Sequence, residues 1–168
     1  MIEIETFEKE LTDEVVNLIL NIQRDEFNVP IKAEDQPDLF EINEFYRKDG
    51  GEFWVAFINK ELVGTISLKI FDKENKEGAI RKVFVKKEFR GKKYGVAYSL
   101  INTLVDYCYK NKIDLLYLGT VDKYKAAHRF YEKNNFTKID KKMVPHKFPF
   151  FSVDNVFYKR CLIKELKN

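Results

Sequence analysis

Residues 83–95 read VFVKKEFRGKKYG, and a helical pattern begins within this stretch. The apolar residues 83–85 end a predicted strand, and Gly91 and Gly95 mark a turn into the helix. The first turn of a helix has free amides and carries partial positive charge, so such a turn favours bound anions. The stretch therefore predicts a site for a diphosphate. A basic helix start with two turn glycines is the alternative, and the residue chemistry alone leaves both open.

The pattern around this stretch predicts a mixed α/β fold. Apolar residues recur at helical spacing over residues 93–110, with Val96, Leu100 and Leu104 on one face. Residues 53–58 and 62–68 are apolar runs joined by a tight turn, which indicates a hairpin. We expect the other strands at 1–7, 78–85, 114–118, 136–139 and 155–163, and the other helices from residue 12 to about 24, from 38 to about 47, and over 124–133.

The predicted order is strand–helix–helix–strand–strand–strand–helix–strand–helix–strand–strand. We expect a largely antiparallel central sheet flanked by helices, built as a single domain over residues 1–168.

Composition narrows the function classes. The 168 residues are 45% hydrophobic and 34% charged, with a formal net charge of +3. This balance argues against a dedicated nucleic-acid binder, which carries a stronger basic excess. Apolar runs are too short for a membrane span. Cys108 and Cys161 lack metal-ligand spacing, and the acidic N-terminus is unlike a signal peptide. We therefore expect a cytoplasmic protein without a metal site.

The anion-binding stretch resembles the acyl-CoA motif of the GNAT superfamily of N-acetyltransferases, which reads Q/R-x-x-G-x-G/A after a strand. Arg90 matches the first position and Gly95 the last. Lys93 stands at the middle glycine position, which is a departure from the motif. A second segment, residues 127–136, resembles the family pattern A-x-x-x-Y-x-x-x-G-F. It places Ala127 and Tyr131 at the family positions, with Asn135 in place of glycine.

The resemblance implies binding of acetyl-CoA as co-substrate at the strand end and the turn. The cofactor-binding residues would be Phe84, Val85, Arg90, Gly91, Lys92, Lys93, Tyr94, Gly95 and Val96. The resemblance also implies transfer of the acetyl group to an amine by direct attack. A main-chain amide near Val85 would stabilise the oxyanion, and Tyr131 would protonate the leaving thiolate. A packed core tyrosine is the alternative interpretation for Tyr131.

The general base is the residue that the sequence identifies least well. The strand before the turn has no glutamate at its centre, and Glu77 lies at its start. Acidic residues in the first helix–loop–helix region are candidates to act through a water, against a plainer role as loop acids. They are Glu26, Glu34, Asp35 and Asp38.

Residues 145–151 form a loop rich in proline and phenylalanine. Its rings either line the acceptor site or a partner surface, or pack over the sheet edge. His146 in this loop is a weak candidate for the acceptor site. Asp154, which follows, is a candidate to bind an acceptor cation, whereas a surface or packing role is expected for His128.

Three function classes follow from these observations. The leading hypothesis is an acetyl-CoA-dependent N-acetyltransferase acting on a primary amine of a small molecule or protein. The alternative is a non-catalytic acyl-CoA-binding or sensing module, favoured by Lys93 and by the absent strand glutamate. RNA binding through the lysine-rich surface is the weakest of the three. The acceptor and the oligomeric state, a homodimer included, stay open.

Overall fold

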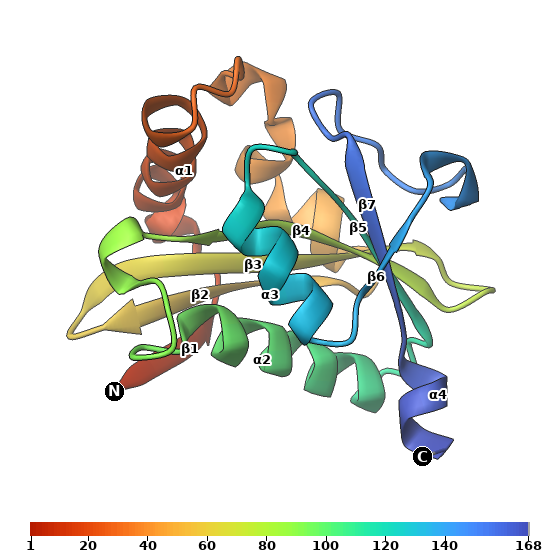
Figure 1. The fold of residues 1–168 in the computed structure, drawn as a ribbon. Coiled ribbons are helices and arrows are strands. Elements are labelled where there is room, and N and C mark those ends of the chain that lie inside the picture. The colour runs from red at the N-terminus through yellow and green to blue at the C-terminus, as the bar shows by residue number, and fades with distance from the viewer. Residues whose placement is uncertain (168) are drawn as a thin grey trace.

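The computed structural model describes residues 1–167, and within them seven strands form one sheet in the order β1-β2-β3-β4-β5-β7-β6 (Figure 1). The strands are β1 (Ile2–Thr6), β2 (Glu52–Ile58), β3 (Glu61–Asp72), β4 (Glu77–Val85), β5 (Leu115–Thr120), β6 (Thr137–Ile139) and β7 (Val156–Cys161). All neighbouring pairs are antiparallel except β4 and β5, which are parallel. The helices are α1 (Thr12–Leu20), α2 (Val96–Lys110), α3 (Lys125–Lys133) and α4 (Leu162–Lys167).

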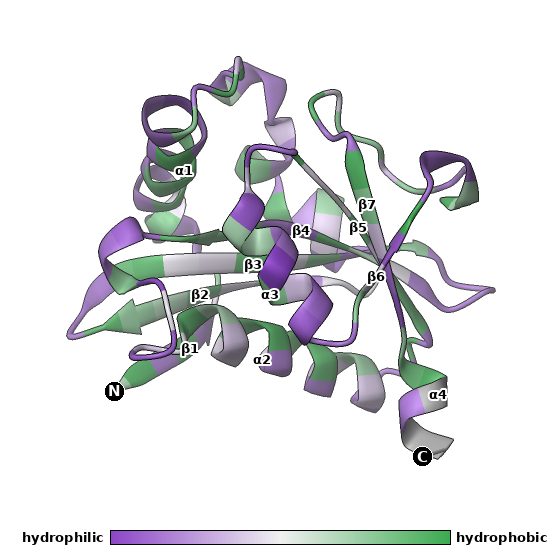
Figure 2. Ribbon diagram, viewed as in Figure 1, coloured by the Kyte–Doolittle hydropathy of each residue, from purple (hydrophilic) through white to green (hydrophobic). Residues whose placement is uncertain are grey.

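Helices cover both faces of the sheet, which confirms the predicted class of a largely antiparallel sheet flanked by helices. Alternation along β2 sends Trp54 to a core shared with Leu100 and Leu104 of α2. It sends Val55 to the opposite core, where Ile19 of α1 packs. Figure 2 shows apolar residues on the sides of α1 and α2 that turn toward the sheet, and polar residues on their outer sides.

Strands β4 and β5 separate part-way along their length. They pair only from Glu77 to Ile80 on β4, opposite Leu115–Leu118. Two residues after this pairing ends, Lys82 adopts a positive φ of 55°. The register of β4 against β3 shifts at the same place, between Thr65 and Ser67 of β3. This β-bulge bends β4, as an extra residue in one strand does. The two strands therefore open a wedge at their C-terminal ends.

Two hydroxyl groups of β3 hold this bulge. The Thr65 hydroxyl donates to the Lys82 carbonyl at 2.7 Å, and the Ser67 hydroxyl donates to the Arg81 carbonyl at 2.8 Å. Both β3 side chains are fully buried. They satisfy carbonyls that the shifted ladder leaves without regular partners. The bulge is therefore a fixed part of the fold.

Strand β3 runs to Asp72, four residues beyond the predicted end at 68. Element boundaries differ from the sequence-based expectations in four other places. Helix α2 begins at Val96 instead of residue 93, because Gly95 takes the left-handed conformation with φ 64°. The predicted helix over 38–47 is two short turns, a 3-10 turn at Pro37–Phe40 and a π-helical turn at Asn43–Arg47. Helix α1 continues as a π-helix over Asn21–Glu26.

The fourth difference lies at the C-terminal end. The last strand stops at Cys161 and α4 follows it, where the sequence predicted a strand to residue 163. The Leu162 amide donates to the Asp114 carbonyl at 2.8 Å, which pins the start of α4 to the beginning of β5. This contact joins segments far apart in sequence, so local patterning does not predict it.

Candidate acetyl-transfer site

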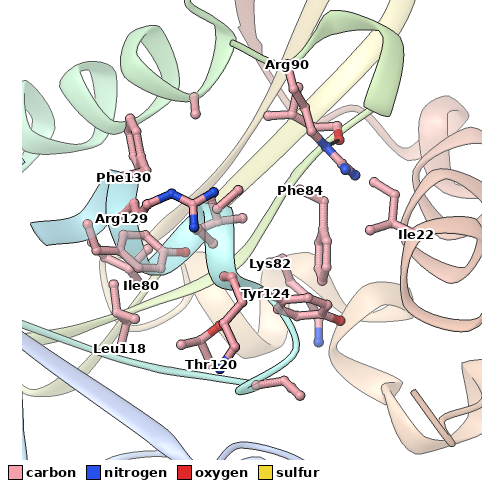
Figure 3. Close-up of a pocket in the computed structure, with 18 of the residues that line it drawn as sticks. Ile22, Ile80, Lys82, Phe84, Arg90, Leu118, Thr120, Tyr124, Arg129 and Phe130 are labelled. Carbon is pink, nitrogen blue, oxygen red and sulfur yellow. Dashed lines mark hydrogen bonds between the residues drawn. The ribbon is translucent and has the colours of Figure 1, made fainter. Parts of the chain in front are cut away.

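A cavity of about 850 Å³ opens at the wedge between β4 and β5. Its walls come from the end of β4, the turn into α2, α3, the end of β5 and the loop before β7 (Figure 3). Phe84 and Val85, both predicted to meet the cofactor, line it. Most lining residues are apolar, and most of the charged ones are basic. The basic lining residues are Arg81, Lys82, Arg90, Lys92, Lys123, Lys125, Arg129 and Lys133, and Asp154 is the acidic lining residue among those described.

The turn into α2 has the conformation of an anion cradle. Gly91 and Gly95 have φ values of 98° and 64°, a backbone conformation that residues with a side chain rarely adopt. A Cβ at either glycine would meet no atom within 4 Å, so the space over both is open to a ligand. The amides of Tyr94 and Gly95 donate back to the Gly91 carbonyl and tighten the turn. The amides of Val96, Ala97 and Tyr98 precede the first helical hydrogen bond of α2, from the Ser99 amide to the Gly95 carbonyl, and all three residues line the cavity.

Arg90 lies at this turn, but its guanidinium is already engaged. It forms a bidentate ion pair with Glu26, with one contact of 2.7 Å, and its Nε donates to the Val85 carbonyl at 2.8 Å. Figure 3 shows the side chain pointing toward the α1 side of the cavity, near Ile22. Arg90 therefore ties the end of β4 to the segment after α1. Glu26, a candidate base, is occupied by the same contact.

Lys93 and Tyr94 were also predicted to bind the cofactor, but neither residue lines the cavity. The Lys93 ammonium lies over the Tyr94 ring, 5.3 Å from its centroid, and that ring packs against Phe89. Lys92, in contrast, is exposed and lines the cavity mouth. The departure from the motif at Lys93 is accommodated because its side chain turns away from the opening.

Tyr131 of α3 lines the cavity and is almost fully buried. Its ring packs against Phe130, Phe136 and Tyr158. Burial first, and then the nearby Asp154 carboxylate, raise the pKa of the phenol well above its ordinary value. The hydroxyl is thus held protonated at neutral pH. Asn135 ends the segment at φ 70°, as expected for an asparagine in place of glycine.

The four other acidic residues considered as the general base lie in different parts of the structure. Asp35 accepts a hydrogen bond from the Lys32 amide and caps a short turn. Glu34 is exposed, and Glu77 lies at the closed end of the β4–β5 pair. Asp38 is buried and accepts the Tyr46 hydroxyl at 2.6 Å. None of these four lines the cavity, within the part of the chain that is described.

Asp154 is the carboxyl group that the fold does bring into the cavity. It lies against Gly119 of β5, where a Cβ would come within 2.6 Å of the Asp154 Oδ2 atom. The absence of a side chain at Gly119 therefore makes room for the carboxylate. Burial raises the pKa of Asp154 to about 6, and the nearby charges of Arg81 and Lys82 limit the rise.

Arg81 and Lys82 were not predicted as site residues. The bulge in β4 places both side chains at the cavity, where the Lys82 side chain is 5% exposed and the Arg81 side chain 12% exposed. Arg81 donates to the Pro149 carbonyl at 2.9 Å, which ties β4 to the loop before β7. Two consecutive basic residues inside an otherwise apolar strand were the only signal in the sequence. A bulge, which turns both toward one side, was not predictable from the pattern.

The loop at 145–151 combines both roles considered for it. Phe148 is buried and packs against Phe71 and Phe157 over the sheet, and with Phe151 it also lines the cavity. His146 is exposed and lies outside the cavity lining. His128 makes a 2.9 Å contact from Nε2 to the Val121 carbonyl, which is a structural role at the start of α3.

Comparison with known proteins identifies the family. The model of the acetyltransferase (GNAT) family matches residues 16–136. The chain belongs to this family. An acetyltransferase of the same family from Staphylococcus aureus Mu50 is 38% identical, with a TM-score of 0.92, over 96% of this chain and 99% of that one. The resemblance seen in the two motifs is thereby confirmed.

One further relative in sequence and one further structure with the same fold are similar to this chain. N-acetylaspartate synthetase from Danio rerio is 30% identical over 103 residues, which cover 61% of this chain. The chain spans only about a third of that protein's length, 36%. An N-acetyltransferase from Thermoplasma acidophilum, solved in complex with coenzyme A, shares the fold at 18% identity, with a TM-score of 0.69 over 96% of this chain and 99% of that one.

No helix within residues 1–167 has the length and apolar character needed to cross a membrane. Within the same residues, no group of three or more His, Cys, Asp or Glu side chains is arranged to hold a metal ion. Cys108 is buried, which raises the pKa of its thiol to about 12.

Proposed function

We propose that the protein is an acetyl-CoA-dependent N-acetyltransferase that acts on a primary amine, with residues 1–168 as one catalytic domain. The observation that carries the proposal is one cavity that joins an anion cradle to a buried acid–base pair. The cradle is the glycine turn at the start of α2, and the pair is Asp154 with Tyr131. Membership of the acetyltransferase family supports the same reaction.

The glycine turn suits the diphosphate of acetyl-CoA. Open space above Gly91 and Gly95 lets an anion approach the main chain, and the helix dipole favours negative charge there. Lys92 and Arg129 line the same cavity and add positive charge, and Figure 3 shows Arg129 on the α3 side. The extended arm of the co-substrate would then follow Phe84 and Val85 along the open edge of β4.

When bound, acetyl-CoA supplies the thioester from which the acetyl group passes to the amine. Asp154 accepts a proton from the acceptor ammonium, because a carboxylate with a pKa of about 6 is ionised at neutral pH. The free amine forms the C–N bond while the C–S bond breaks. A main-chain amide at Phe84–Val85 stabilises the oxygen. Tyr131 donates a proton to the leaving sulfur and regains one from the new amide nitrogen.

Release of free thiol from acetyl-CoA with a panel of primary amines tests this function. We expect thiol release that depends on an amine and that falls by about a hundredfold or more in the Asp154→Asn variant, the range for a lost general base. Asp106→Asn is the matched control, because Asp106 is exposed on α2. Tight coenzyme binding in a calorimetric titration without turnover on any amine would instead support the non-catalytic binding module.

A further inference from the structure

Lys82 has an environment that neither the family fold nor the proposed acid–base pair explains. Its side chain is 5% exposed and lines the cavity. Figure 3 shows Lys82 projecting into the same part of the cavity as Tyr124 and Phe84. The two buried hydroxyls on β3 fix the bulge that carries Lys82, so its ammonium is presented from a rigid support.

The Lys82 ammonium lacks a hydrogen-bond acceptor among the described residues. Within the described part of the chain, one carboxylate oxygen lies within 4 Å of this ammonium, Asp38 Oδ2 at 3.7 Å, which is longer than a hydrogen bond. That oxygen already accepts the Tyr46 hydroxyl at 2.6 Å. On another side the ammonium lies over the Phe151 ring, 4.6 Å from its centroid. Within the described residues no fully buried side-chain nitrogen lacks a partner, so the unused donors of Lys82 face the cavity, where an anionic ligand oxygen would accept them.

The neighbouring cation is held more firmly. Arg81 Nη1 donates to the Pro149 carbonyl at 2.9 Å, and its Nε donates to the Tyr46 hydroxyl at 3.4 Å. Its Nη2 lies 3.9 Å from Asp38 Oδ2. Among the described residues, Lys82 is therefore the cation of this pair that no hydrogen bond holds in place.

The charge balance of the cluster changes during the proposed reaction. Before an acceptor binds, Arg81 and Lys82 are balanced by Asp38 and Asp154. Once Asp154 accepts the proton of the acceptor ammonium, the cluster holds one uncompensated positive charge. A carboxylate on the acceptor would compensate it, and Lys82 is placed to receive that carboxylate. The coenzyme phosphates cannot fill this role, because the glycine turn lies beyond Val85, at least three residues and about 10 Å farther along β4.

We propose that the acceptor is a primary amine that carries a carboxylate, as a free amino acid does, and that Lys82 binds this carboxylate beside Asp154. This inference rests on the proposed N-acetyltransferase function and adds the class of acceptor to it. The ammonium of the acceptor then faces Asp154, and its carboxylate faces Lys82. Both ends of a small zwitterion are recognised by one cluster.

The test compares free L-amino acids with the corresponding L-amino acid amides, which keep the amine and lose the negative charge. Thiol release is measured for the wild-type protein and for Lys82→Met, Lys82→Arg and Lys138→Met. Lys138 on β6 is exposed and serves as the matched control. We expect the wild type to prefer an acid over its amide. In Lys82→Met, KM for the acid should rise about 10- to 100-fold, the range for a lost charge-assisted hydrogen bond.

In the same variant we expect KM for the amide to change by less than about threefold, whereas Lys82→Arg should recover part of the affinity for the acid. Loss of the Lys82 charge also raises the pKa of Asp154 and should lower kcat alike for both acceptors, so KM is the constant that tests the inference. Three results would overturn the inference. They are a wild type that prefers amides, a wild type that acetylates polyamines but no amino acid, and a Lys82→Met variant in which KM rises equally for acids and amides. Absence of turnover with every amine would defeat the proposed function itself.

Calorimetric titration with coenzyme A keeps the result interpretable if a variant is inactive. A Lys82→Met protein that binds coenzyme A as the wild type does is folded around the glycine turn. Its kinetic constants then report on the acceptor end of the cavity. If Lys82→Met does not fold, Lys82→Gln decides, because glutamine keeps a polar side chain without the charge. A lost preference for acids then supports the inference, and a retained preference overturns it.

Discussion

Asp154 is expected to oppose folding while it supports catalysis. Burial raises the pKa of its carboxyl group from 3.8 to about 6. At about 1.4 kcal/mol for each pH unit between the two values, the ionised carboxylate costs roughly 3 kcal/mol of folding free energy at neutral pH. Asparagine has the same shape and no charge. The Asp154→Asn variant should therefore be more stable than the wild type and almost inactive.

The pH dependence gives the sign of this effect. Below pH 3.8 the carboxyl is protonated in the folded and the unfolded protein, so the two proteins should be equally stable. As pH rises toward 6 the unfolded state loses its proton first, and the wild type loses stability. Urea unfolding should show the variant about 1 kcal/mol more stable near pH 4.5 and about 3 kcal/mol more stable near pH 8.

An exposed aspartate provides the control for these unfolding measurements. Asp106→Asn, on the exposed side of α2, should shift the unfolding free energy by less than about 0.5 kcal/mol at either pH. If Asp154→Asn is equally stable or less stable near pH 8, the carboxylate is not held at a cost. If the variant also retains full thiol-release activity, Asp154 has no role as a base.

Other substitutions probe the remaining parts of the site. Tyr131→Phe should lower kcat more than it changes KM, because a proton donor acts in the transition state, and unchanged kcat would make Tyr131 a packing residue. Gly119→Ala should reduce kcat without weakening coenzyme binding, since its Cβ would lie 2.6 Å from Asp154 Oδ2, and normal kcat would contradict the placement of that carboxylate. Gly95→Val should weaken coenzyme A binding in a calorimetric titration, because φ 64° strains a branched residue and its side chain would enter the open space, and unchanged affinity would exclude the turn as the phosphate site. Burial lowers the pKa of Lys82 to about 8, so KM for amino acid acceptors should rise above that pH as the ammonium loses its charge. In Lys82→Met the KM profile should be flat over the same range, and this comparison checks the prediction.

The sequence predicted the elements whose signals are local. The apolar runs of β2 and β3, joined by a tight turn, indicated the hairpin, and the spacing of Val96, Leu100 and Leu104 indicated α2. The two glycines identified the turn into α2, because positive φ is a property that residue type decides. Order along the chain then gave the class of the fold. These features depend on the preferences of neighbouring residues, which a sequence displays directly.

The tertiary structure decided which charges meet at the cavity. Arg90 pairs with Glu26, 64 residues earlier in the chain, instead of standing free at the turn. Asp154 reaches the wedge because Gly119, on another strand, leaves room for it. A β-bulge presents Lys82 beside Asp38. The burial and partners of an ionisable group depend on segments brought together from distant parts of the chain, and these contacts set its charge and its chemistry.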